Sequence, residues 1–279
     1  MSRSFAFIAI LYLIGNALSF NFHSSFARYQ TKLRTSSIMR MVSDIGGKVF
    51  VSGIGNLDED EFLLSLLNEQ GIWEQISLGS EDSLVTKKRF LSRTARYSGL
   101  LDVLTFVDVS PQNETSLTSA LTGANTWLAF NASQDDILKY SDVAIAAGIK
   151  RAVFTTELAP ERINDTSIPE FDHALNVFEQ AGGAFTGIRH GTIIPGDENN
   201  PYEIVNASVP CLEDTVERGV LSRVVAELTC IPDATNKVCG LSSSGAFTQK
   251  YLELLRATGV NRRQEVAKVF NGGIQKLAR

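Results

Sequence analysis

The sequence predicts an α/β fold in which helices cover a doubly wound, mostly parallel sheet. Two observations support this prediction. Short apolar runs alternate along the chain with helical patterns of about ten residues, and the first of these runs, 48–52, ends directly in a glycine turn. Strands joined by helices of this length need crossover connections, which are right-handed and give parallel pairing. The chain has 279 residues, of which 44% are hydrophobic, so it can bury a large core.

The predicted strands and helices follow one another from residue 49 to residue 194. The helices carry apolar residues at helical spacing, as Phe62, Leu63, Leu66 and Leu67 do. The predicted strands are 49–52, 73–78, 103–109, 126–130, 152–155 and 185–194, and the predicted helices are 61–68, 114–121, 137–147 and 171–180. The less regular C-terminal third is expected to form a small region on the substrate side of the sheet, with helices 213–228, 247–258 and 263–276 and a strand 237–241.

The turn after the first strand has the residues of a phosphate-binding loop, Gly53-Ile54-Gly55-Asn56. Gly53 permits a tight turn, and Gly55 lets the backbone approach a pyrophosphate. The position of a third glycine is Asp58, which begins an acidic run that ends at Glu61. Acidic side chains in the first turn of a helix interact with the same positive end of the helix dipole that would attract a phosphate. Each such interaction stabilises the helix by about 0.3–1 kcal/mol. Two interpretations stay open: a cofactor site opposed by charge, or a helix capped by Asp58 with Glu61 closing a capping box.

The first 43 residues differ in charge from the rest of the chain. They contain five Lys or Arg residues and no acid, which leaves −10 on the remainder of a chain whose net charge is −5. Residues 5–18 are an apolar run too short to span a bilayer comfortably. We predict a signal peptide at 1–19 and a transit-peptide-like leader at 20–43. This arrangement resembles the bipartite plastid presequence of diatoms and related algae, whereas a secretory signal before a polar linker is the alternative.

Charge and cysteine content exclude several classes of function. An acidic chain offers no general basic surface for nucleic acid, and the dense basic patch after the leader is confined to residues 86–97. Cys211, Cys230 and Cys239 lie late in the chain and form neither a disulfide framework nor a CxxC metal pair. We expect them to be small buried hydrophobic residues. We predict no metal site, and no transmembrane span in the mature chain.

Several segments occur in the order of one known family. They are 48–56, 106–109, 117–125, 148–154 and 185–191, together with the late segments 216–221 and 236–239. In this order they resemble the atypical short-chain dehydrogenase/reductases, specifically the NmrA-like NAD(P)-binding group. The resemblance covers residues 46–245 and implies a Rossmann-like NAD(P)-binding domain there, followed by a helical extension at 246–279.

The resemblance also implies a set of cofactor contacts. Asp108 matches an acid whose side chain or neighbouring amide meets the adenine, although it can instead cap the next segment. Arg189 matches the arginine of an arginine-proline-glycine turn in which His190 replaces the proline, although it can instead pair with a buried acid. The candidate cofactor contacts are Gly53, Ile54, Gly55, Asn56, Asp108, Val109, Phe130, Asn131, Thr155 and Arg189.

The catalytic residues of the resembled reductases are not evident in this chain. Those enzymes commonly use a tyrosine acid and a lysine four positions later, which lowers the tyrosine pKa and holds the ribose. Tyr140, Tyr202 and Tyr251 have no such lysine, and His173 stands where the family often has it. His173 and His190 are candidate ribose contacts, although a lone histidine more often has a surface or packing role.

Two functions therefore stay open. One is an NAD(P)-dependent oxidoreductase acting on an unknown small molecule, with unknown catalytic residues. The other is a noncatalytic plastid assembly or regulatory factor with a degenerate nucleotide site. We expect nucleotide binding rather than turnover.

Overall fold

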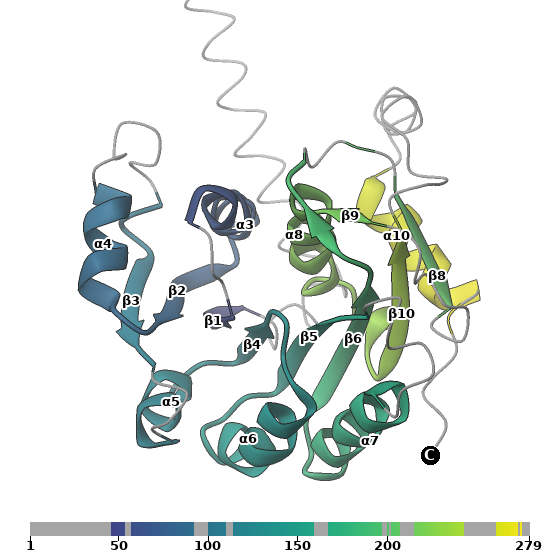
Figure 1. Cartoon of the computed structure of the whole chain (residues 1–279), viewed down its shortest axis with the longest axis horizontal. Helices are drawn as coiled ribbons and strands as arrows, with labels where there is room; N and C mark the ends of the chain where they lie inside the picture. The colour runs from purple at the N-terminus through teal and green to yellow at the C-terminus, as the bar shows by residue number, and fades with distance from the viewer. Residues whose placement is uncertain are drawn as a thin grey trace, which may run out of the picture. The chain divides into compact units, whose positions relative to one another are not determined.

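The computed structural model describes residues 46–53, 57–91, 100–109, 114–158, 167–196, 200, 202–206, 215–242, 261–272 and 274. Residues 45–279 form one compact unit around an eight-stranded sheet with the order β3-β2-β1-β4-β5-β6-β10-β8 (Figure 1). The strands are β1 (Gly47–Ser52), β2 (Trp73–Ser80), β3 (Leu104–Asp108), β4 (Thr126–Ala129), β5 (Arg151–Glu157), β6 (Ala184–His190), β8 (Glu203–Asn206) and β10 (Lys237–Ser242). Only β8 pairs antiparallel, with β10. The predicted doubly wound, mostly parallel α/β fold is confirmed.

The strand order reverses between β1 and β4. From β1 the chain moves outward through β2 to β3, then returns to place β4 on the other side of β1. The register sets Ser52, the last residue of β1, beside Ala129, the last residue of β4. In doubly wound sheets ligands bind outside the carboxyl ends of the strands at such a switch point.

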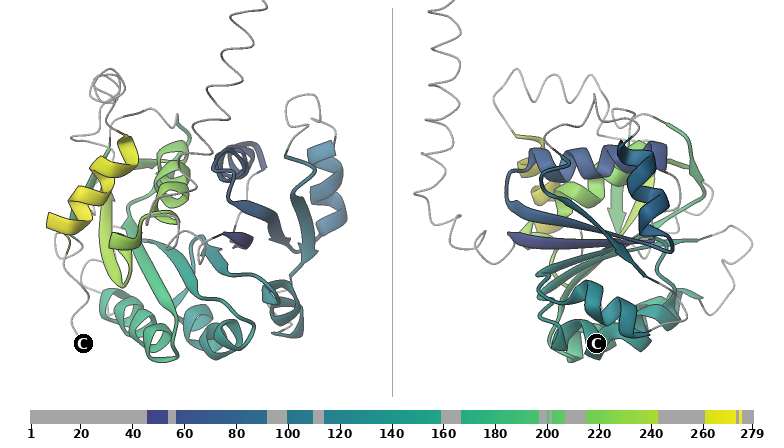
Figure 2. Two further views of the ribbon diagram at one scale, coloured as in Figure 1. Left: turned by 180° about the vertical axis from the view of Figure 1, so that it is seen from behind. Right: turned by 90° about the vertical axis from the view of Figure 1, so that its left-hand side faces the viewer.

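Helices cover both faces of the sheet (Figure 2). One face carries α3 (Leu57–Glu69), α4 (Ser83–Leu91), α8 (Arg218–Leu228) and α10 (Arg262–Gly272). The other carries α5 (Glu114–Leu121), α6 (Gln134–Ala146) and α7 (Ser167–Gln180). Two separate hydrophobic cores result, one on each side of the sheet.

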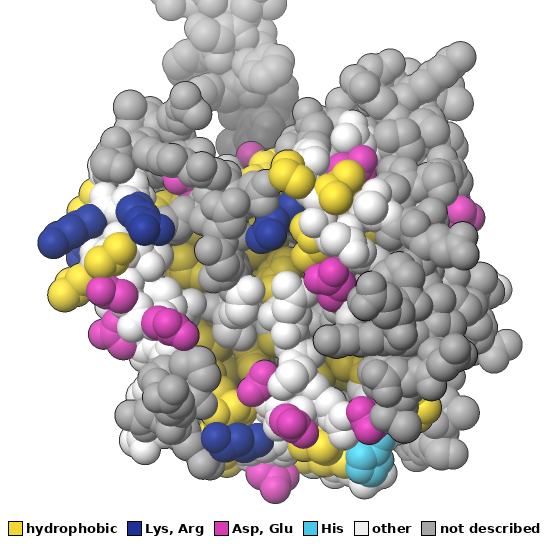
Figure 3. Space-filling model, in the orientation of Figure 1, with side chains coloured by type: hydrophobic (Ala, Val, Ile, Leu, Met, Phe, Trp, Pro, Cys, Tyr) yellow, Lys and Arg dark blue, Asp and Glu magenta, His cyan; other side chains and the backbone are white. Residues whose placement is uncertain are grey.

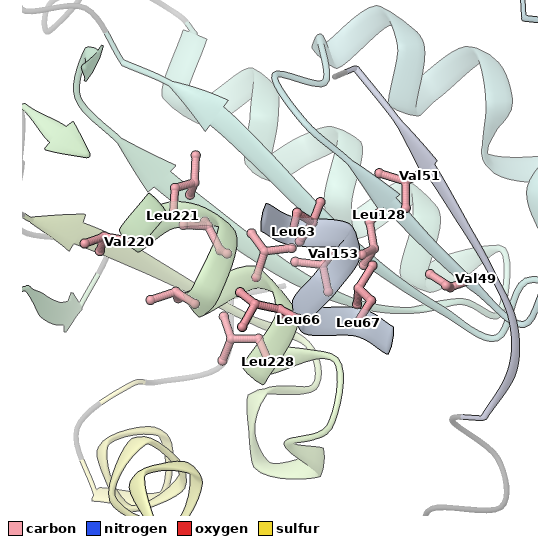
Figure 4. Close-up of a cluster of buried hydrophobic side chains, with 14 of the residues drawn as sticks. Val49, Val51, Leu63, Leu66, Leu67, Leu128, Val153, Val220, Leu221 and Leu228 are labelled. Atoms are coloured by element: carbon pink, nitrogen blue, oxygen red, sulfur yellow. The ribbon is translucent and has the colours of Figure 1, made fainter. Parts of the chain in front are cut away.

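Aliphatic side chains fill the core between the sheet, α3 and α8 (Figure 4). In α3, Leu63 and Leu67 lie four residues apart and therefore on one face of the helix. In α8, Val220, Leu221 and Leu228 lie within the same core and are fully buried. This packing fixes both helices against β1 and β4, and so positions the carboxyl edge of the sheet.

The structure corrects two predicted elements. The predicted strand 185–194 is broken, because β6 ends at His190 and Ile193–Ile194 form β7, which pairs with β9 in a second sheet. The predicted helix 213–228 begins only at Arg218, because Val216–Glu217 form β9. The predicted helix 247–258 lies outside the described residues.

Helix α10 packs into the same hydrophobic core as α3 and α8. Val266 and Phe270 of α10 are fully buried in it, and the Lys237 side chain donates a hydrogen bond to the Phe270 carbonyl. In the described part of the chain, no helix is long and apolar enough to cross a bilayer.

Candidate functional site

A cavity of about 600 Å³ lies at the switch point, outside the carboxyl ends of β1, β2, β3 and β4. Gly53, Ser80 and Val109, which end or follow three of these strands, lie at its base. Its walls come from helices on both faces of the sheet, with Val85, Thr86 and Arg89 from α4, Leu117 from α5, and Asp136 and Tyr140 from α6. Phe130 and Asn131, directly after β4, complete the lining.

Close contact between the ends of β1 and β4 shapes the cavity. The Phe130 amide donates to the Ser52 carbonyl at 3.0 Å, and the Trp127 indole Nε1 donates to the Ser52 hydroxyl at 2.9 Å. Gly53 has φ +78, and a Cβ built on it would lie 1.9 Å from the Phe130 carbonyl oxygen. A glycine is therefore required here by the protein's own backbone, whether or not a phosphate approaches.

The remainder of the predicted phosphate turn, Ile54, Gly55 and Asn56, lies outside the described residues, as do the side chains of 57–60. The prediction that the acidic helix start opposes a phosphate therefore stays a prediction for Asp58. Glu61 is only 4% exposed, so the last acid of the run is buried in α3.

Asp108 anchors the start of α4. Its carboxylate accepts a hydrogen bond from the Ser83 amide at 2.8 Å, and hydrogen bonds from Ser83 hold the pKa of this exposed carboxyl below its usual value. The sequence left open a cap of the segment that follows Asp108, whereas the helix it caps precedes it in the chain. Its neighbour Val109 lines the cavity, with its amide bonded to the Ser80 carbonyl at 2.8 Å.

Thr155 supports the loop after β4. Its buried hydroxyl accepts from the Asn131 amide at 3.1 Å, and its carbonyl accepts from the Ala132 amide at 3.0 Å. Asn131 has a left-handed φ of +47, so the two bonds hold a backbone turn that asparagine tolerates better than most residues. Thr155 thus positions the lining residues rather than lining the cavity itself.

Arg189 and the two candidate histidines do not line the cavity. Arg189 forms an ion pair with Asp172 of α7, which is the second of the roles considered for it. His173 is exposed on α7. His190 is 1% exposed; its Nδ1 lies 2.8 Å from the Gly191 carbonyl, and its Nε2 has no hydrogen-bond partner within the described ranges. Burial lowers the pKa of His190.

Sequence reasoning did not identify the cavity residues contributed by α4 and α6. Ser80, Thr86, Arg89, Trp127 and Tyr140 line the site, but only Arg89 belonged to a pattern, the basic patch at 86–97. A usable signal was the position of Ser80, because the residue that ends the second strand of such a sheet lies beside the bound ribose.

The cavity lining carries more negative than positive charge. Glu81, Asp82 and Asp136 line it, and Arg89 is the one cation in the described lining. Two of the acids have structural partners, because Asp82 accepts from the Val85 amide at 2.9 Å and Asp136 accepts from the Ser133 hydroxyl at 2.6 Å. The described lining therefore contains no basic cradle.

Solved structures share this architecture. No protein-family model matches the sequence, and no curated protein matches it. A short-chain dehydrogenase/reductase from Veillonella parvula DSM 2008, solved in complex with NADP, is 15% identical and aligns over 73% of this chain and 97% of its own, with a TM-score of 0.54. The fold is Rossmann-like.

Two further solved structures agree with this assignment. A Rossmann-fold NAD(P)-binding family protein from Shigella flexneri is 16% identical over 73% of this chain and 96% of its own, with a TM-score of 0.51. The anaerobillin reductase ChuY from Escherichia coli O157:H7 is 15% identical over 72% and 98%, with a TM-score of 0.53. At identities this low, the structural likeness establishes the fold alone and assigns no activity. In the residues described, no group of His, Cys, Asp and Glu side chains could hold a metal ion.

The Gly53 contact predicts a specific loss of stability. Gly53→Ala places a Cβ against the Phe130 carbonyl oxygen at a positive φ, and should lower the free energy of unfolding by about 2–4 kcal/mol. Gly123→Ala is the matched control, because Gly123 has φ +75 and nothing within 4 Å of the added Cβ. It should cost only about 1 kcal/mol. Urea unfolding measures both, and equal losses would show that the contact with Phe130 is unimportant.

The buried histidine predicts a pH dependence. Burial holds the folded-state pKa of His190 below its ordinary value of 6.5, so the unfolded chain binds a proton at this residue first as the pH falls. Stability should therefore decline as the pH falls below 6.5, until the folded-state pKa is reached. His190→Leu should flatten this part of the stability–pH curve. Parallel curves for wild type and His190→Leu would refute the assignment.

Proposed function

We propose that this protein binds a nicotinamide dinucleotide, with the adenosine half in the switch-point cavity, as a member of the NmrA-like atypical short-chain dehydrogenase/reductases. The observation that carries the proposal is the cavity's position, at the carboxyl ends of β1 to β4 where the strand order reverses. The likeness to a solved reductase in complex with NADP supports it.

The lining residues suit the parts of an adenosine phosphate. Val109, Leu117 and Trp127 offer apolar and aromatic surface for an adenine ring. Ser80, Thr86 and Arg89 group at the end of β2 and on α4, where hydroxyl groups and a guanidinium would meet ribose and phosphate oxygens. When bound, the nicotinamide would supply a hydride; the residues of this cavity bind and orient the adenosine end.

Charge predicts that binding is weak. A dinucleotide carries at least two phosphate charges, and the described lining offers three carboxylates and one guanidinium. Arg89 is therefore expected to account for much of the attraction to the phosphates.

Calorimetry with NADH and NADPH tests the role of Arg89. Arg89→Ala should raise the dissociation constant about fivefold, equivalent to roughly 1 kcal/mol for one exposed charge-assisted contact. Lys88→Ala is the matched control, because the neighbouring Lys88 is exposed but does not line the cavity. AMP and ADP should compete with the dinucleotide, and nicotinamide mononucleotide should not. Competition by the nicotinamide mononucleotide alone would place the ligand elsewhere.

We further propose binding without conventional reductase turnover, as in a noncatalytic assembly or regulatory factor. Tyr140 lines the adenosine cavity on α6, and Tyr202 is fully buried, so neither of these tyrosines is placed as a proton donor beside a nicotinamide. An alkoxide formed by hydride transfer needs such a donor within hydrogen-bond reach.

A turnover screen distinguishes the two functions. We expect NADPH and NADH oxidation with quinones, aldehydes and ketones to be slow, with any residual activity depending on His173 or on water. Rapid turnover that is unaffected by His173→Ala but abolished by Tyr140→Phe would establish a conventional oxidoreductase instead. A folded Tyr202→Phe variant that lost rapid turnover would lead to the same conclusion.

Import into a plastid by way of the secretory pathway is the localisation we propose. The apolar run at 5–18 and the acid-free basic stretch that follows it support this proposal. A fusion of residues 1–45 to a fluorescent protein in an algal host should label plastids. Fluorescence confined to the secretory pathway or the medium would contradict it.

A further inference from the structure

One short helix carries the exposed large hydrophobic residues of the part of the chain that the structure describes. Leu84 is 69% exposed, Val85 41% and Leu91 46%, and all three belong to α4. Three basic residues, Lys87, Lys88 and Arg89, lie between them and are exposed as well. The nine residues of this helix include no acid.

Helical geometry separates an outer stripe from the packed side of α4. Phe90, 1% exposed, and Ser83 face the protein. Leu84, Lys88 and Leu91 follow the spacing i, i+4 and i+7, so they share one stripe, about a third of a turn around the helix from the packed side. An exposed cation therefore lies between two exposed leucines on the same face.

This outer stripe lies at the rim of the molecule. The helix covers β2 and β3, and β3 is the terminal strand of the large sheet (Figures 1 and 2). Hydrophobic and basic side chains adjoin over this end in Figure 3. The residues of α4 that line the cavity are Val85, Thr86 and Arg89, so the cavity lies to the inner side and the outer stripe is convex.

Helix stabilisation explains only part of this pattern. Cations in the last turn interact favourably with the helix dipole, which accounts for the placement of Lys88 and Arg89. Single exposed hydrophobic residues are also common on protein surfaces. Neither reason accounts for two leucines flanking a lysine on the most exposed stripe of one helix.

We propose that the outer face of α4, formed by Leu84, Lys87, Lys88 and Leu91, docks on an anionic lipid surface. Leucines that enter the boundary between headgroups and acyl chains, beside lysines that reach lipid phosphates, are the composition of an interfacial helix. A convex stripe fits a flat lipid surface, whereas a helical peptide partner would need a groove.

The charge distribution orients this contact. Of the acids beside the start of α4, Glu81 and Asp82 line the cavity on its inner side, and Asp108 accepts a hydrogen bond from the Ser83 amide. The chain after residue 43 has a net charge of −10, so an anionic surface repels most of the protein and attracts the basic helix. The same helix contributes three residues to the cavity, so the docked protein would hold its nucleotide site beside the lipid surface.

Vesicle co-sedimentation tests the proposal with the full-length chain. Wild type should bind phosphatidylcholine vesicles that contain phosphatidylglycerol, and should bind them less at high salt. Lys88→Glu should lower the partition coefficient on the order of 25-fold, because two charges change at a surface where each is worth about fivefold. Leu84→Ser combined with Leu91→Ser should also lower it on these vesicles.

The control is Lys150→Glu, the same charge change at an exposed residue before β5, and it should leave binding unchanged. All of these proteins carry the same first 43 residues, so the apolar leader contributes equally to each. Equal binding by wild type and both α4 variants would overturn the proposal. Self-association that the double serine variant abolishes, without vesicle binding by wild type, would also overturn it and assign the face to a second copy of the chain.

Discussion

The close contact between the carboxyl ends of β1 and β4 is the constraint on which the site depends. The Gly53 backbone lies against the Phe130 carbonyl, at a distance that no Cβ permits. The Phe130 amide and the Trp127 indole are both bonded to Ser52. These contacts join the two halves of a sheet whose strand order reverses at this point, and they leave a cavity outside the strand ends. The glycine is therefore explained by packing before any ligand is considered.

Shape and charge give different information about this cavity. Its position and its aromatic and aliphatic lining suit an adenosine group, while its carboxylates oppose the phosphates that accompany one. Two of those carboxylates serve the fold, since Asp82 and Asp136 accept hydrogen bonds at the starts of α4 and α6. These two acids are therefore placed by the starts of their helices, and Arg89 is the one cation in the described lining. All of these features are consistent with a protein that has this fold, binds a dinucleotide weakly and oxidises it slowly.

The sequence predicted the fold well because the fold depends on local patterns. Apolar runs located the strands β1 and β4, and apolar residues at helical spacing located the helices α3 and α5, in each case to within a few residues. The break after His190 was missed because the apolar pair Ile193–Ile194 follows so closely on the strand, and the pairing of β7 with β9 shows the interruption. In the site, the resemblance to a known family predicted Val109 and Asn131, and both line the cavity. Thr86 and Arg89 could not be predicted, because their place in the cavity depends on how α4 folds over the end of β2. The partners of Asp108 and Arg189, which are Ser83 and Asp172, are contacts between elements that no local pattern specifies.

Amide hydrogen exchange with and without NADPH tests the central claim most directly, which is that a nucleotide binds at the switch-point cavity. The account predicts slower exchange on binding in the segments that end β1, β3 and β4, around Gly53, Val109 and Asn131. Exchange at the opposite edge of the sheet, around Asn125 and Lys150, should not change. Protection at that opposite edge, or no protection at any segment lining the cavity at saturating NADPH, would contradict the account.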